Sequence, residues 1–150
     1  MIRMFERNPS KNAAWFICKF FVGPKLAIST LNTYGNYLSY EWKRAWRWRP
    51  GAAYVNHDPP VVSYDGEDIS FANPFTHKET FDAGLVFSHY AYVISQQVEF
   101  KTTRYEIATG VYSWKMLQCE TNFPQKLSKY LPWVKDEAMV DVAPSEHWFR

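Results

Sequence analysis

The segment 40–57 combines residue types that can move a proton and hold a charged ligand. Glu41 opens a run rich in tryptophan and basic residues, and His57 ends a short apolar segment beyond the Pro50-Gly51 pair. A carboxylate within hydrogen-bond distance of a hydroxyl group can accept its proton, and a neutral imidazole is a frequent metal ligand. We therefore consider Glu41 a candidate general base and His57 a candidate metal ligand.

Each of these residues also has a structural interpretation. Glu41, near a helix start and one turn before Arg44, could form a surface ion pair that stabilises the helix by about 0.2–0.5 kcal/mol. His57 could simply hydrogen-bond within the fold, and so could His89, the second candidate metal ligand, which lies in an apolar segment. Neither histidine has the tight spacing to other ligands that is typical of a zinc site. Both interpretations of each residue stay open at this point.

The run from Trp42 to Arg49 interleaves rings and cations, which suggests a binding surface. Its candidate substrate-binding residues are Trp42, Arg44, Trp46, Arg47 and Trp48. Basic residues between aromatic rings suit single-stranded nucleic acid. They also suit a sugar linked through pyrophosphate, because arginine binds phosphate oxygens in a fork and tryptophan stacks on the sugar. The structural alternative is a helix with one buried aromatic face and one solvated basic face.

These residues need secondary structure to position them. Leu38, Trp42 and Ala45 would share one face of a helix, so the spacing predicts a helix over 38–48 that ends at the Pro-Gly pair. The polar residues 1–12 are expected to fray. Apolar alternation and turn residues predict strands over 25–30, 53–56, 61–64 and 85–92, and either a strand or a short buried segment over 15–21. Helical spacing predicts helices over 95–107 and 111–119. The predicted fold class is α+β, with short strands in a small mixed sheet together with helices.

The composition sets the size and the partners that we expect. A chain of 150 residues predicts a single domain or part of one. Seven Trp, ten Tyr and eleven Phe are more rings than a small core needs, so some should line a surface or a groove. The net charge of +2 is too small to favour nucleic acid as a partner.

The compartment follows from the hydrophobic runs and the cysteines. No run reaches the roughly 18 uncharged residues that a membrane span needs, and no small-residue cleavage site of the signal-peptide type is present. Cys18 and Cys119 lie far apart and form no CxxC pair, which favours two buried thiols in a reducing compartment. We therefore expect a cytoplasmic protein without a transmembrane segment. Peripheral contact with a membrane is compatible with this expectation.

In their order along the chain, these motifs resemble inverting glycosyltransferases of the large family 2 type, which have the GT-A fold. Residues 40–47 resemble the family's acidic motif and the arginine-containing helix after it, with Tyr40-Glu41 where the family often has Glu-Asp. Residues 51–57 are similar to the glycine, strand and histidine that follow. Four further segments resemble the region beyond the core in a bacterial branch: 87–93, 97–101, 123–124 and 131–134.

The resemblance covers the C-terminal, acceptor-side half of that fold and implies a role for each residue. It implies that Glu41 deprotonates an acceptor hydroxyl, which attacks the anomeric carbon of a nucleotide-sugar with inversion. It implies a divalent cation, Mg²⁺ or Mn²⁺, that neutralises the leaving diphosphate, with His57 or His89 as its ligand. The tryptophans at 42, 46 and 48 would form part of the acceptor wall. The nucleotide-binding β-α-β units and the Asp-x-Asp of the N-terminal half have no counterpart in the chain.

The resemblance also implies partners, and it leaves an alternative. The expected ligands are a nucleotide-sugar donor and a glycan or lipid-linked acceptor, and a second chain could supply the donor-binding half. We expect the chain to be inactive alone and to be an enzyme only when it is completed. The alternative is a noncatalytic interaction or assembly protein, whose aromatic-rich surface binds a partner protein or a glycan.

Overall fold

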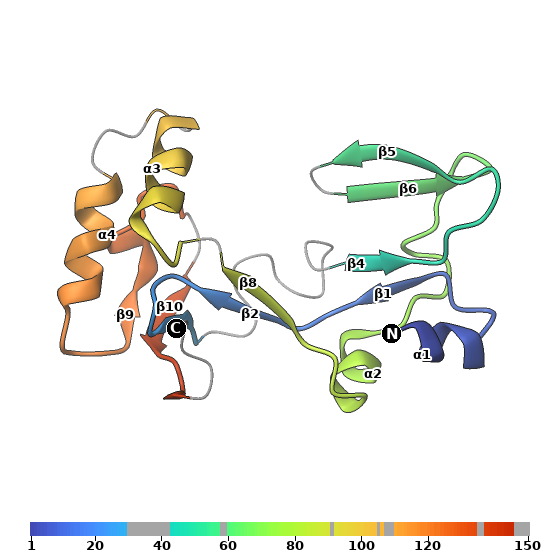
Figure 1. Ribbon diagram of the computed structural model, residues 1–150, viewed down its shortest axis with the longest axis horizontal. Coiled ribbons are helices and arrows are strands. Elements are labelled where there is room, and N and C mark those ends of the chain that lie inside the picture. Colours follow the sequence, from blue (N-terminus) through green and yellow to red (C-terminus); the bar gives the residue numbers. More distant parts are fainter. Residues whose placement is uncertain are drawn as a thin grey trace. The chain divides into compact units, whose positions relative to one another are not determined.

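A computed structural model describes residues 1–29, 43–57, 60–90, 92–104, 106, 110–134 and 137–145. The chain divides into two compact units, the first formed by residues 1–18 and 35–87 and the second by residues 19–34 and 88–150 (Figure 1). The α+β class is confirmed. In place of one small mixed sheet, the described strands form three small sheets of two, five and three strands.

The first unit contains short strands between two short helices. Its elements are α1 (Ile2–Arg7), β1 (Ala13–Trp15), β4 (Lys43–Trp46), β5 (Ala53–His57), β6 (Pro60–Tyr64), β7 (Glu67–Asp68) and α2 (His77–Asp82). β1 pairs antiparallel with β4, and β5 pairs antiparallel with β6, as the labelled arrows in Figure 1 show. β7 adds to β6, so β5, β6 and β7 form an antiparallel meander. On its other side β1 bonds to the backbone of Phe75, so Ala13 and Ala14 are completely buried.

The helix predicted over 38–48 is wrong for its described part. Residues 43–46 form the strand β4, whose partners in β1 place Lys43 opposite Trp15 and Trp46 opposite Ala13. Residues 38–42 lie outside the described residues. The strand is favoured because tryptophan has high β propensity, and because pairing with β1 overrides a weak local helical preference. The Pro-Gly pair therefore makes a turn between strands and ends no helix.

The N-terminal residues are ordered into a helix, contrary to the expected fraying of 1–12. The helix α1 has no buried residue of its own. Its attachment comes from Arg47, whose guanidinium donates hydrogen bonds to the carbonyl oxygens of Phe5, Asn8 and Lys11. The last carbonyls of a helix have no partner within the helix, so a cation that binds them stabilises this end.

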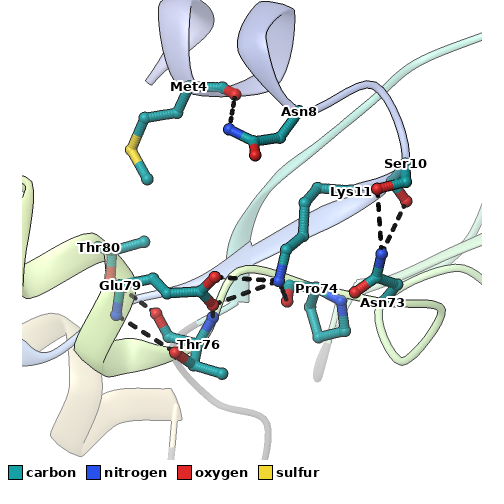
Figure 2. A network of polar contacts seen from close by, with 9 residues as sticks. All are labelled: Met4, Asn8, Ser10, Lys11, Asn73, Pro74, Thr76, Glu79 and Thr80. Atoms are coloured by element: carbon teal, nitrogen blue, oxygen red, sulfur yellow. Dashed lines mark hydrogen bonds and ion pairs between the residues drawn. The ribbon is translucent and has the colours of Figure 1, made fainter.

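A polar network joins the residues after α1 to the start of α2 (Figure 2). The Nζ atom of Lys11 lies 2.9 Å from the carbonyl oxygen of Pro74 and 3.1 Å from Oε1 of Glu79. Glu79 also completes a capping box with Thr76 at the N-terminus of α2. The backbone hydrogen bond from Thr76 lowers the pKa of Glu79, burial opposes this effect, and Lys11 lowers the pKa further.

The second unit packs a helical hairpin against a five-stranded sheet. Its elements are β2 (Cys18–Phe21), β3 (Leu26–Ile28), β8 (Phe87–Tyr90), α3 (Ser95–Arg104), α4 (Gly110–Cys119), β9 (Gln125–Lys126), the 3₁₀ helix η1 (Leu127–Lys129) and β10 (Met139–Val142). The sheet order is β8-β2-β3-β10-β9, and the division between the two units falls within β2 and β8. The two helices predicted in this region are confirmed as α3 and α4, with different ends.

Trp114 on α4 anchors the helices to the rest of the second unit. Its Nε1 donates hydrogen bonds to the carbonyl oxygens of Val22, at 2.8 Å, and Tyr92, at 2.7 Å. The indole is buried, and Leu117, one turn further on, is fully buried. A buried indole that satisfies its N–H stabilises a core without a polar penalty.

Replacing Gly110 by alanine should lower the free energy of unfolding by about 1–3 kcal/mol. The new Cβ would lie 2.0 Å from Cγ2 of Thr102 and 2.8 Å from Cζ3 of Trp133, so α3 and α4 would have to separate. Urea unfolding followed by circular dichroism measures the change. Tyr112→Ala, at a position on α4 that is 70% exposed, is the control and should change stability by less than about 0.5 kcal/mol. Equal midpoints for Gly110→Ala and the parent chain would contradict this packing.

Candidate functional site

The segment after β4 presents one tryptophan between two anchored arginines. Arg47 binds the carbonyl oxygens around the end of α1, and the guanidinium carbon of Arg49 lies 3.7 Å from the ring centroid of Tyr64. Trp48, between them, is 62% exposed. Because the residues on both sides are held, the backbone at Trp48 is fixed and its indole is presented to solvent. Large exposed rings of this kind are more typical of binding surfaces than of ordinary protein surface.

A tight turn keeps Arg49 in this position. The backbone N–H of Ala52 donates to the carbonyl oxygen of Arg49 at 3.0 Å, and Gly51 has a φ of +88°. Proline followed by a glycine with positive φ is the combination typical of a type II turn. A Cβ at Gly51 would lie 3.4 Å from the ring of Tyr64, so the turn also packs closely on this ring.

Some of the other predicted binding residues have side chains that are hydrogen-bonded within the fold, and others have exposed side chains. The Nε1 of Trp46 donates to Oγ of Ser70 at 3.1 Å, so this indole serves the interior of the first unit. Arg47 likewise uses its donors on backbone carbonyls. Arg44 is exposed, lies 5.4 Å from the ring centroid of Phe87 and donates to the carbonyl oxygen of Lys43. Arg44 and Trp48 are thus the predicted binding residues that reach solvent among those the structure describes.

Beneath this surface lies a buried ammonium group. Lys43 is 1% exposed, and its Nζ lies 3.2 Å from Oδ2 of Asp68. The rings of Phe71 and Trp15 flank it, with centroids 5.0 Å and 5.8 Å from Nζ. A buried charge needs a counter-charge and further polar or π contacts, and this arrangement supplies both.

Ser70 connects this ion pair to both indoles of the β1–β4 ribbon. Its backbone N–H donates to Oδ1 of Asp68 at 2.9 Å, which is an Asx turn. Its carbonyl oxygen accepts from Nε1 of Trp15, and its hydroxyl accepts from Nε1 of Trp46. Ser70 is fully buried, and its bond with Trp15 is buried, whereas its bonds with Asp68 and Trp46 are partly buried.

Two pKa shifts follow from this environment. Burial raises the pKa of Asp68, but the hydrogen bonds from Ser70 and Lys43 and the charge of Lys43 outweigh it, so the net pKa lies below the usual value. Burial lowers the pKa of His77, whose ring centroid lies 5.6 Å from that of Trp15. The cluster therefore holds an ionised carboxylate and favours a neutral imidazole.

The predicted base and metal ligands are not brought together by the described structure. Glu41 and Trp42 lie outside the described residues, and so does the side chain of His57, whose backbone belongs to β5 in the first unit. His89 belongs to β8 in the second unit, where its ring stacks on Phe20 with centroids 4.6 Å apart. Within the described ranges, no three His, Cys, Asp or Glu side chains gather as they would around a metal ion.

Comparisons with known proteins add no family assignment, because no protein-family model, no curated protein and no solved structure matches the chain.

In the described part of the chain, no helix combines the length and the apolar character needed to cross a membrane. Cys18 is half-buried and Cys119 is exposed, and neither forms a disulfide, so the expected burial of both is wrong for Cys119.

The residues that organise this region were largely missed from the sequence. The candidate site residues chosen from the sequence do not include Asp68, Ser70 or Tyr64. One signal was available, because an Asp two residues before a Ser is a common Asx-turn pattern. The contact of Asp68 with Lys43 spans 25 residues and depends on the strand pairing, so no local pattern indicates it.

Asp68→Asn should lower the free energy of unfolding by about 3–5 kcal/mol, because it leaves the buried ammonium of Lys43 without a carboxylate. Lys43→Met in the same chain removes that charge and should recover part of the loss. Urea unfolding of the two single variants and the double variant measures the coupling. A midpoint of Asp68→Asn equal to that of the parent chain would show that the ion pair contributes nothing.

The first unit should become less stable as the solution is acidified. Asp68 and Glu79 have folded pKa values below their usual values of 3.8 and 4.5, so the unfolded chain binds protons first. Their stabilisation is complete above the usual values and is lost as the pH falls through the folded ones. Urea midpoints measured from about pH 6 to about pH 3 should therefore decrease. The decrease should be smaller in Glu79→Gln, and an unchanged slope in that variant would contradict the assignment.

Proposed function

We propose that the chain is the acceptor-side part of an inverting glycosyltransferase of the family 2 type and GT-A fold. It would transfer a sugar from a nucleotide-sugar to a hydroxyl group of a glycan or lipid-linked acceptor, when a donor-binding part in the same or a second chain completes it. The observation that carries the proposal is the fixed, exposed indole of Trp48, which follows Glu41 within one run of the sequence. The order of the motifs over 40–57 supports the same class.

The surface around Trp48 suits a carbohydrate for physical reasons. Sugar rings present flat patches of C–H groups, which stack on an indole, and hydroxyl groups, which need polar partners at its edge. Arg44 is exposed in the neighbouring strand and offers a cation for phosphate or hydroxyl oxygens. A ring that is already held in place loses little conformational entropy when a ligand binds.

In the proposed reaction, this chain would carry out one proton transfer. Glu41 would accept the proton of the acceptor hydroxyl as its oxygen attacks the anomeric carbon of the donor. The bond from that carbon to the diphosphate oxygen breaks, and the diphosphate leaves with the electron pair. Because the attack is in line, the anomeric configuration inverts. General base catalysis of this kind contributes about 10²–10⁴-fold to a rate.

The expected Mg²⁺ or Mn²⁺ remains a prediction that rests on the resemblance. The described residues do not fit a metal centre of their own, because the carboxylate of Asp68 is bound to Lys43 and Ser70 and the ring of His89 is stacked on Phe20. We therefore derive no step through a metal. A role of His57 as a ligand stays part of the proposal.

A second candidate function is noncatalytic binding of a partner protein or glycan. It is favoured by the number of large exposed rings in the first unit, where Trp48, Tyr54, Phe71 and Phe81 are each more than half exposed. Both functions use Trp48, and only the first uses Glu41. Paired substitutions at these two positions therefore distinguish them.

Glu41→Gln should reduce sugar transfer by about 10²–10⁴-fold with little change in stability, since the amide keeps the shape but cannot accept the proton. The assay measures release of nucleoside diphosphate from UDP-, GDP- and dTDP-sugars by the chain isolated with its native companions. Glu106→Gln, at an exposed position in the second unit, is the control and should keep full turnover. Unchanged turnover in Glu41→Gln would remove Glu41 from the mechanism and leave the noncatalytic function.

Trp48→Ala should weaken binding of neutral oligosaccharides by about tenfold, because it removes the stacking surface. Isothermal titration calorimetry with a panel of oligosaccharides measures the affinity. Tyr112→Ala, which removes a ring with 70% exposure from α4 in the second unit, is the control and should bind as the parent chain does. Equal losses in both variants would show that Trp48 has no special role.

A further inference from the structure

The second unit contains a groove of about 690 Å³ between the helix α4, the strands β3 and β10, and the residues after α4. Most of its lining is apolar, with Pro24, Leu26, Trp114, Phe123 and Val142 contributing. Pockets of about 300–1,000 Å³ are the usual size for one small molecule. The described residues that line the groove include none of those assigned to sugar transfer.

The floor of the groove is a pair of apolar side chains on adjacent strands. Leu26 of β3 lies directly opposite Val142 of β10 in the antiparallel ladder. Residues that face each other in such a pair project on the same side of the sheet. Val142 is 50% exposed and is the part of this floor that is open to a ligand, whereas Leu26 is 5% exposed and lies deeper.

The wall of the groove is held rigidly in place. Trp114 donates to the carbonyl oxygens of Val22 and Tyr92, and Nε2 of Gln118 also donates to Val22, at 3.2 Å. A Cβ at Gly23 would lie 2.1 Å from Oε1 of Gln118, so the amide of Gln118 packs directly against the backbone at Gly23. A groove with a fixed wall loses little entropy when it binds a ligand.

The charges that line the groove favour an anion. Lys25 and Lys115 are its cations, from the start of β3 and from α4, and Glu120 is its one acidic side chain in the described lining. Glu120 already accepts a hydrogen bond from the hydroxyl of Tyr130, and its Oε1 lies 3.7 Å from Nζ of Lys129. The acidic charge is thus offset by Lys129, and the lining keeps a positive balance.

We propose that this groove binds a single-chain amphiphile with an anionic head group. The hydrocarbon chain lies on Leu26 and Val142 against Trp114, and the phosphate or carboxylate head contacts Lys25 and Lys115. The apolar floor accounts for the chain, and the two lysines account for the head. This site is independent of the sugar-transfer proposal, since it uses other residues and belongs to the other unit.

The thiol of Cys119 offers a direct readout, because it is exposed and lines the groove. The rate of its alkylation by iodoacetamide in the intact chain is measured by peptide mass spectrometry, with Cys18 as the internal reference. Octyl phosphate and octanoate, kept below micelle-forming concentrations, should slow alkylation of Cys119 by about tenfold at about ten times their Kd. Alkylation of Cys18 should not change.

Variants and simpler probes separate the two parts of the site. Lys115→Glu should weaken octyl phosphate binding by about tenfold or more, because it reverses a charge at the head group. Lys78→Glu makes the same charge change on α2 of the first unit and should leave the affinity within about twofold. Octanol, which has the chain alone, and inorganic phosphate, which has the head alone, should each protect Cys119 much less.

Several results would overturn the proposal. Equal protection by octanol would remove the head-group site, and equal protection by inorganic phosphate would remove the apolar floor. The same affinity in Lys115→Glu and the parent chain would exclude Lys115 from the site. Protection by phosphatidylglycerol vesicles but by neither soluble amphiphile would assign the groove to a membrane surface. Stronger protection by octyl phosphate than by octanoate identifies a phosphate head group, and the reverse identifies a carboxylate. Either result supports the site when Lys115→Glu also weakens binding and octanol and inorganic phosphate protect Cys119 much less.

Discussion

The burial of the Lys43 ammonium imposes the strictest physical constraint on the first unit. An ammonium group that is 1% exposed requires a carboxylate, and the carboxylate comes from Asp68 on β7. Asp68 reaches it only when the meander β5-β6-β7 and the β1–β4 ribbon fold together. Ser70 reinforces this arrangement, because it binds Asp68 and receives the N–H groups of Trp15 and Trp46.

This constraint fixes what the first unit shows to solvent. With Lys43 turned inward, the alternation of β4 turns Arg44 outward. The chain beyond β4 is then held by Arg47 on the carbonyls of α1 and by Arg49 on Tyr64. Trp48 lies between these contacts. The need to pair the buried charge of Lys43 therefore leads to an exposed aromatic surface. The second unit is organised by different contacts, in which Trp114 and Gln118 fix one side of an apolar groove.

The sequence predicts the elements whose signals are local, and it fails where pairing decides. The strands around 53–56 and 61–64 and the helices near 95–107 and 111–119 were found from alternation, turn residues and helical spacing. The helix predicted over 38–48 is wrong for its described part, because rings and cations that alternate along the chain fit a strand as well as a helix. Pairing with β1, through Ala13 and Ala14, selects the strand, and these alanines gave no local signal.

The candidate site was predicted in part. Trp48 is exposed and its contact with a ligand stays a prediction, whereas Trp46 and Arg47 are hydrogen-bonded within the first unit. Their engagement depends on Ser70 and on the carbonyls of α1, which lie far away in the sequence. Lys43 looked like one more surface cation in a basic run, and only the folded arrangement reveals it as a buried charge.

The proposed function depends most on Trp48 being a fixed surface on which a carbohydrate stacks. The indole N–H resonances in a ¹⁵N–¹H correlation spectrum report on each tryptophan during titration with a neutral oligosaccharide. We expect a saturable shift of the Trp48 resonance, while those of Trp15, Trp46 and Trp114, whose N–H groups are bonded inside the fold, stay in place. A Trp48 resonance that does not move with any oligosaccharide in the panel would contradict it.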